Sequence, residues 1–221
     1  MKLGVAGVAT PLLAIVICGC GGSSASSSHT PAKAKRAPSG TGPAAVAPPP
    51  GTPAALRGVH GVQGGVLLAG ELPGFAPRGF AAPSTSAQSE VAEFPPDRRA
   101  AEAARLRALG FVASVTERLA PAKGGVNEEA ISLVEQFRSA HGASGEVTAQ
   151  AELALARGES AFAVPGIPAA RGFGSSAGGP PDANVTFSVG AYYYLVGFSS
   201  PMLTRSQLIA AAQRLYGRVR G

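Results

Sequence analysis

The stretch NVTFSVGAYYYLVGFSS, residues 184–200, carries the strongest fold signal in the chain. Apolar and polar residues alternate from Val185 to Val189, which is the period of a strand with one buried face. Gly190 and the alanine after it suit a tight turn, and the apolar, aromatic run from Tyr192 to Phe198 can return as the partner strand. The stretch therefore predicts a β-hairpin.

The segment after the hairpin predicts a terminal helix. In TRSQLIAAAQRLYGRVRG, residues 204–221, Thr204 and Gln207 have the spacing of a capping box, in which each side chain bonds to the other's backbone N–H. Apolar residues follow at helical spacing, so one face of the helix can lie on the sheet: Leu208, Ala212, Leu215 and Val219.

Upstream of the hairpin, a helix and a strand are expected in succession. PPDRRAAEAARLRALGF has a proline at a helix start, an alanine-rich body and Gly110 in the position of a C-terminal glycine. This predicts a helix over 97–109. The following FVASVTERLA alternates Phe111, Ala113 and Val115 with polar residues, which is typical of a half-buried strand.

The region 129–157 fits two interpretations. We favour a strand over 129–138 and a helix over 145–157, because Gly142 and Gly145 interrupt the run and the residues after them favour helix. The alternative is a single broken helix. A short strand is expected before Pro165.

The turn-rich segment 67–80 is expected to wrap the domain as a loop, with packing points at Leu67, Leu68, Leu72 and Phe75. Together these segments predict an α+β fold, an antiparallel sheet with helices packed on it.

The N-terminus has the pattern of an export signal. Lys2 precedes about fifteen mostly apolar residues, too few for the roughly twenty that span a bilayer. The run ends in ICGC, residues 17–20, which resembles a bacterial lipobox, with Gly19 before the cut and Cys20 after it. That resemblance implies a diacylglyceryl thioether on Cys20. The alternatives are a membrane anchor that is not cleaved and ordinary secretion. Cys18 would leave with the signal, and no disulfide within the mature chain would be possible.

The residues after Cys20 are dominated by serine, proline, glycine and alanine up to about residue 60. Such a composition cannot bury enough apolar surface to offset the entropy of ordering, so it predicts a disordered tether with a reach of roughly 35 Å. The expected organisation is a lipoprotein signal peptide over 1–19, the lipidated cysteine and tether over 20–60, and one domain over 61–221.

The formal charge of +6 belongs mostly to the signal and the tether, because the region from Gly61 onward has a net charge of only +1. This charge distribution and the expected extracytoplasmic location disfavour nucleic acid as a partner, and we expect none. The basic residues near the anchor either lie against anionic headgroups or form a soluble linker.

The order of elements, together with YYYLVGF and LIAAAQRLYGRV, resembles the PsbP-like, LpqN-type sandwich of actinobacterial envelope lipoproteins. The resemblance implies a mostly non-enzymatic binding or accessory protein on the extracytoplasmic face of the cell membrane. It names no ligand and no protein partner.

Catalytic motifs are weak. GSSAG, residues 174–178, matches a nucleophile elbow with Ser176 as nucleophile, but GPPDAN follows instead of a helix and no histidine comes later. The overlapping GFGSSA lacks the helix that dinucleotide binding needs. His141 stands alone, with Glu146 as a speculative companion ligand. We therefore expect no enzymatic activity, metal or cofactor, with an envelope hydrolase using Ser176 or His141 as the alternative.

Tyr192, Tyr193 and Tyr194 are the candidate ligand contacts. On a strand, the first and third face one way and the second the other. Their rings could stack on a glycan or a small hydrophobic ligand. The favoured alternative is that they pack beneath the helices or line an interface. The predicted function is a lipid-anchored binding or accessory lipoprotein, and a passive structural lipoprotein is a further alternative.

Overall fold

The computed structural model describes residues 64–80, 83–123, 129–175 and 181–221. The predicted signal peptide, lipidation site and tether lie outside these ranges, so the predicted organisation of the N-terminal part stays a prediction. Within the described ranges, no helix is both long and apolar enough to cross a membrane.

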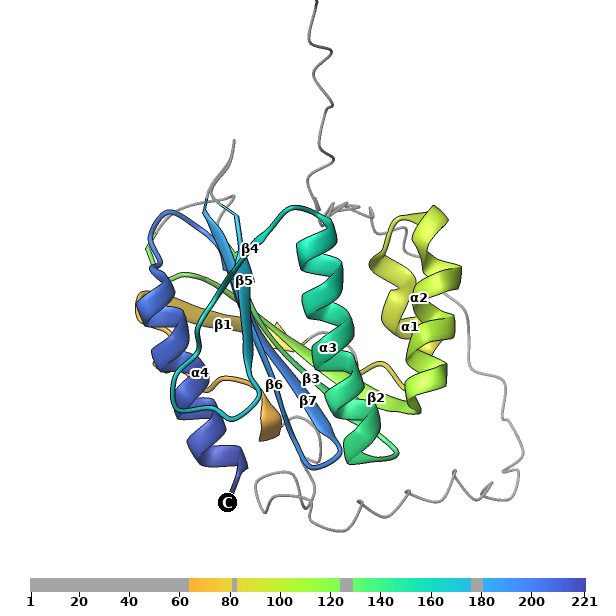
Figure 1. Ribbon diagram of the computed structural model, residues 1–221. Helices are drawn as coiled ribbons and strands as arrows, with labels where there is room; N and C mark the ends of the chain where they lie inside the picture. The colour runs from red at the N-terminus through yellow and green to blue at the C-terminus, as the bar shows by residue number, and fades with distance from the viewer. Residues whose placement is uncertain (1–63, 81–82, 124–128, 176–180) are drawn as a thin grey trace, which may run out of the picture. The chain divides into compact units, whose positions relative to one another are not determined.

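The domain is built on a seven-stranded antiparallel sheet (Figure 1). Its order is β1-β2-β3-β7-β6-β5-β4. The strands are β1 (Phe75–Phe80), β2 (Phe111–Pro121), β3 (Glu129–Phe137), β4 (Ser160–Phe162), β5 (Arg171–Gly174), β6 (Asp182–Val189) and β7 (Tyr192–Ser199). With helices packed on this sheet, the predicted α+β class is confirmed.

The predicted hairpin is confirmed as β6 and β7. Val189 pairs with Tyr192 across the turn. Gly190 has φ of 56°, a left-handed value that glycine adopts without strain. β7 also pairs with β3, so the hairpin supplies the middle of the sheet and its central strand is covered on both faces.

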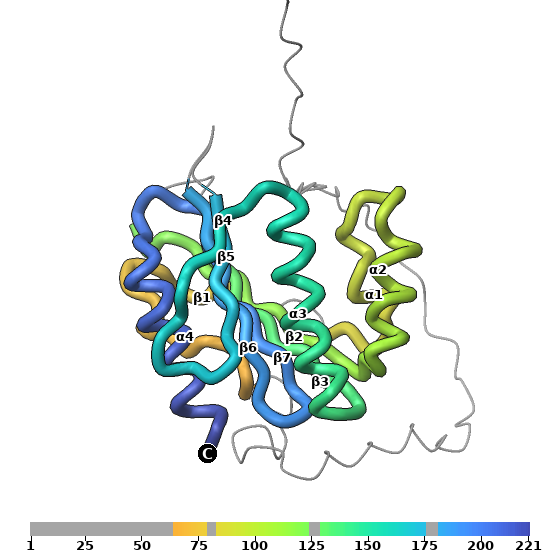
Figure 2. Tube along the Cα trace, in the orientation of Figure 1, coloured from red at the N-terminus to blue at the C-terminus, as the bar shows by residue number. Residues whose placement is uncertain are grey.

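The two faces of the sheet carry different helices (Figures 1 and 2). One face packs against α4 (Arg205–Val219) and the segment 64–75; the other packs against α1 (Ala87–Glu90), the 3-10 turn η3 (Val91–Glu93), α2 (Pro96–Leu109) and α3 (Ala140–Ala156). α4 begins with the predicted capping box between Thr204 and Gln207. Its four predicted core residues are all buried.

α3 begins five residues earlier than predicted. Ser139 caps it by accepting a hydrogen bond from the Gly142 N–H, so the two glycines that were expected to interrupt the chain lie inside the helix. Both face the end of α2: a Cβ on Gly142 would collide with the Leu109 carbonyl oxygen, and one on Gly145 would meet the Leu109 side chain at 2.8 Å. These glycines allow close helix packing, which the sequence interpretation had missed.

The segment 67–80 was predicted as a loop, but its second half is the edge strand β1, which pairs with β2. Leu67, Leu72 and Phe75 are buried as expected, whereas Leu68 is 52 % exposed. β1 contains Pro77, and its pairing is interrupted by a bulge between Pro77 and Gly79. Proline is tolerated there because an edge strand leaves one side of its backbone unpaired.

The burial of residues along β2 also differs from the predicted alternation of apolar and polar side chains. Ser114, on the polar side of the predicted pattern, is buried on the face covered by α1, α2 and α3 and pairs through its backbone with Ser84. A register shift between Phe111 and Ala113 and the cover provided by α1 explain the difference.

Candidate functional site

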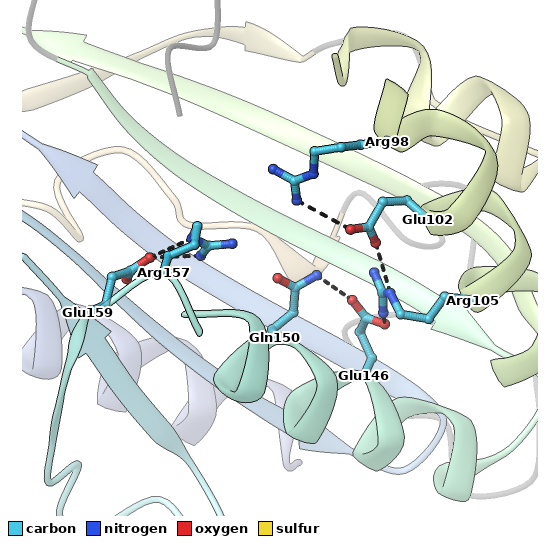
Figure 3. Close-up of polar contacts among 7 residues, drawn as sticks. All are labelled: Arg98, Glu102, Arg105, Glu146, Gln150, Arg157 and Glu159. Carbon is cyan, nitrogen blue, oxygen red and sulfur yellow. Dashed lines mark hydrogen bonds and ion pairs between the residues drawn. The ribbon is translucent and has the colours of Figure 1, made fainter. Parts of the chain in front are cut away.

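A chain of polar contacts links α2 to α3 (Figure 3). Glu102 accepts hydrogen bonds from Arg98 at 3.3 Å and from Arg105 at 2.9 Å. Arg105 also forms an ion pair with Glu146 on α3, and the other Glu146 oxygen accepts from Gln150 at 2.7 Å. We call these five residues the α2–α3 network.

Helical spacing explains how the network forms. Arg98, Glu102 and Arg105 follow one another at intervals of four and three residues, which puts them on one side of α2. Glu146 and Gln150 share a side of α3 for the same reason. Because Gly142 brings the start of α3 against the end of α2, Arg105 lies within reach of Glu146.

Two side chains of the sheet lie beneath the network. Glu135 on β3 and Tyr193 on β7 are paired in register and face the helices. They are 4 % and 1 % exposed, and the Glu135 Oε2 and Tyr193 hydroxyl have no hydrogen-bond partner among the described residues. Unpaired buried polar atoms are costly. Two of them side by side therefore point to this part of the sheet as a candidate functional site.

Burial and neighbouring charge raise the pKa of both groups. For Glu135, loss of hydration is the largest cause of the raised pKa, and repulsion by Glu146 and Glu90 adds to it, whereas Arg105 opposes it. The Tyr193 hydroxyl has its pKa raised mainly by burial and then by Glu146 and Glu135. The arrangement therefore favours a proton on Glu135.

Glu90 extends this cluster toward β2. It accepts a hydrogen bond from the Ser114 hydroxyl, and its pKa is raised because burial outweighs the hydrogen bonds from Ser114 and Ser84. The cluster thus holds four glutamates, at 90, 102, 135 and 146, against the guanidiniums of Arg98 and Arg105. Such a set can bind hydroxyl-bearing or cationic groups and can hold protons. Among the described residues, no group of three or more His, Cys, Asp or Glu side chains is arranged to hold a metal ion.

Glu135→Gln is expected to make folding less dependent on pH. The pKa of Glu135 is raised on folding, so its contribution to the free energy of unfolding is fully present below its unfolded pKa and is lost as pH rises through the folded pKa. Each unit of that rise corresponds to about 1.4 kcal/mol. The stability of the variant relative to the wild type should therefore increase from pH 4 to pH 8 in urea titrations.

Glu152→Gln, on the exposed side of α3, is the control for losing the same charge elsewhere. A difference between Glu135→Gln and the wild type that stays constant from pH 4 to pH 8 would contradict proton uptake by Glu135 on folding.

The three tyrosines predicted from sequence lie in the core. Tyr192 and Tyr194 pack on the α4 side, where the Tyr194 ring stacks on Phe187 with centroids 4.9 Å apart. Tyr193 packs on the α2 and α3 side. All three are at most 2 % exposed, as the alternative interpretation predicted. Direct ligand contact by their rings stays a prediction.

Of the other predicted site residues, only His141 lies in the described part of the chain. Ser176, Gly19 and Cys20 lie outside the described residues. His141 is exposed near the start of α3, and its carbonyl oxygen accepts a hydrogen bond from Ser144. Catalysis by Ser176 or His141, like the expected lack of enzymatic activity, stays a prediction.

Sequence reasoning missed the α2–α3 network, although two signals were present. Glu102 stands between Arg98 and Arg105 at ion-pair spacing on a predicted helix, and Glu135 interrupts the apolar run ISLVEQF of a predicted strand. What the sequence lacks is the distance between α2 and α3, so the pairing of Arg105 with Glu146, 41 residues apart, could not be inferred.

The fold is similar to that of a mycobacterial protein domain. The crystal structure of the extracellular domain of PknH from Mycobacterium tuberculosis matches with a TM-score of 0.50 and 13 % sequence identity, over 72 % of this chain and 95 % of that domain. At this identity the likeness concerns the fold. No protein-family model matches the sequence, and no curated protein matches it significantly. The PsbP-like resemblance stays a prediction.

Proposed function

We propose that this protein is a lipid-anchored extracytoplasmic binding or accessory lipoprotein, and that the α2–α3 network is its binding site. The observation that carries the proposal is a polar network that solvent can reach at one end and that is buried at the other. The Arg98 and Arg105 side chains are 33 % and 22 % exposed, whereas Glu146 is 1 % exposed.

This decrease in exposure from the arginines to Glu146 suits the recognition of a ligand. The buried carboxylates hold the two guanidiniums in fixed positions, and a preorganised donor loses less entropy when a ligand arrives. Beside the network, Leu133 and Leu195 on the sheet are only partly buried. A few fixed polar groups beside apolar side chains are typical of small-molecule sites.

The site offers both hydrogen-bond donors and hydrogen-bond acceptors, because guanidinium groups and carboxylates alternate along the network. This combination favours a ligand with several hydroxyl groups, such as a glycan. A small hydrophobic ligand is less favoured, since the tyrosine rings that would contact it are buried.

Two further observations support the proposed extracytoplasmic location of the protein. The ICGC stretch at residues 17–20 has the lipobox pattern, and the fold is shared with a domain described as extracellular. A lipid on Cys20 with two or three acyl chains would hold the protein on its membrane, because each buried methylene contributes about 0.8 kcal/mol.

Cys20→Ser is expected to release the protein from the membrane fraction and to leave a mass without acyl chains. The matched control is Cys18→Ser, which removes the neighbouring thiol and should leave fractionation and the mature mass unchanged. Cell fractionation and intact mass spectrometry of the purified protein measure both effects. Mass spectra of the wild type recorded under native conditions should also show the added mass of a bound glycan that purifies with the protein. Membrane retention of Cys20→Ser equal to that of the wild type would contradict the anchor.

A further inference from the structure

The layer formed by residues 64–75 and α4 has a charge opposite to that of the other helix layer. It contains Arg205, Arg214, Arg218 and Arg220 (the last just after α4) and a single acid, Glu71, for a net charge of +3. The stretches 86–109 and 139–159, which form the opposite layer, contain seven acids and five arginines, for a net charge of −2.

Three of the four arginines on the α4 side are exposed. Arg205 lies over the Phe162 ring at 5.1 Å and Arg220 over the Tyr216 ring at 5.4 Å, while Arg214 donates to the Glu71 carbonyl oxygen. None of these three forms an ion pair in the described part of the chain. Their charges are therefore available to an anionic partner.

Exposed apolar side chains lie in this layer and next to it, and one more, Leu155, lies on α3 in the opposite layer. Leu68 in the segment 64–75 is 52 % exposed, and Met202, two residues before the Thr204 cap of α4, is 51 % exposed. Arginines beside exposed apolar side chains are the combination that binds the headgroup region of an anionic bilayer.

The described chain also begins on this layer. Arg218 donates to the carbonyl oxygens of Gly64 and Val66, both at 2.7 Å, and pairs with Glu71 at 3.0 Å. Figure 2 shows this first segment beside α4. The chain that leads back to Cys20 thus joins the domain at α4, on the side away from the α2–α3 network.

We propose that the α4 layer is the membrane-facing surface of the domain, and that it binds anionic lipid headgroups while the α2–α3 network faces away from the bilayer. This inference rests on the lipid anchor of the proposed function. The anchor brings the domain close to the surface, and the charge difference between the two layers selects the face that contacts it. Screening by salt removes this preference, because the Debye length falls to about 3 Å at 1 M.

The test uses the lipidated full chain in two kinds of vesicle, phosphatidylcholine alone and phosphatidylcholine with phosphatidylglycerol. A single fluorophore is attached at Ser206→Cys on α4 or at Ala100→Cys on α2, both exposed positions. Because Cys18 would be removed and Cys20 acylated, the introduced thiol is the reactive one. Quenching by a nitroxide carried on lipid headgroups reports which label is near the bilayer.

On vesicles with phosphatidylglycerol, quenching at position 206 should exceed that at position 100 by about twofold or more, and the difference should disappear on phosphatidylcholine alone or in 1 M salt. Arg214→Gln with Arg220→Gln should remove it as well. The matched control, Arg99→Gln with Arg138→Gln, removes two exposed arginines from outside the α4 layer and should leave the difference intact.

Equal quenching of the two labels on phosphatidylglycerol vesicles, with the protein bound to both vesicle types, would overturn the membrane-facing role of α4. A protein that floats with neither vesicle type would instead contradict the lipid anchor, and the orientation with it. The salt comparison needs no substitution, so the result does not depend on the folding of the arginine variants.

Discussion

Gly142→Val is expected to destabilise the domain by about 3 kcal/mol, the upper end of the usual cost of overpacking a core. Gly142 lies in the first turn of α3, where an added Cβ would collide with the Leu109 carbonyl oxygen and meet the Phe137 Cβ at 3.2 Å. Backbone atoms at the end of α2 cannot move aside as a side chain can. For a domain of this size the loss corresponds to a decrease in Tm of roughly 6 to 12 °C.

The matched control is Gly217→Ala in α4. In the described part of the chain, no atom lies within 4 Å of the position that a Cβ would take at Gly217. The alanine should therefore stabilise the helix through its higher propensity, by up to about 1 kcal/mol. Urea unfolding and thermal melts measure both variants. If Gly142→Val unfolds at the same urea concentration as the wild type, α3 does not pack against α2 in the way described.

Arg105→Ala is expected to cost about 3 to 5 kcal/mol, because it leaves buried carboxylates without their cation. Glu146 is 1 % exposed. Among the described residues it would keep only Gln150 as a partner, and Glu102 would keep only Arg98. Loss of the arginine also removes the ion pair that joins α2 to α3, so the binding site proposed between these helices should be lost as well.

A double-mutant cycle separates this effect from a general loss of packing. Glu146→Gln removes the charge that Arg105 neutralises, so adding it to Arg105→Ala should recover part of the lost stability. Arg99→Ala, on the exposed side of α2, is the control and should stay within about 0.5 kcal/mol of the wild type. Strictly additive effects of Arg105→Ala and Glu146→Gln would contradict the coupling between them.

Local signals in the sequence predicted much of the fold. The hairpin, α2 with Gly110 at its end, and α4 with its capping box each depend on residues close together in the chain, and each is confirmed. Errors arose where a distant element decides the conformation. Gly142 and Gly145 were interpreted as helix breakers, but they are small residues at the contact of α3 with Leu109.

The candidate site was harder to predict for a related reason. The conspicuous Tyr192–Tyr194 triplet supplies core packing, because β7 lies in the middle of the sheet with helices on both faces. The charged residues that approach one another come from α2, α3 and β3. Apart from Glu135, which interrupts an apolar run, each looks like an ordinary surface charge in its own segment. Only the packing of these elements shows that Glu135 and Glu146 are buried.

The two outer strands of the sheet have a consequence for the proposed anchoring of the protein to a membrane. β1 carries Pro77 and a bulge, and β4 is only three residues long, so both edges offer an incomplete ladder to an incoming strand. Interrupted and short edges of this kind protect β proteins from aggregating edge to edge. Proteins confined to a surface meet their own copies often, and these blunted edges would allow a high density of molecules without the growth of a continuous intermolecular sheet.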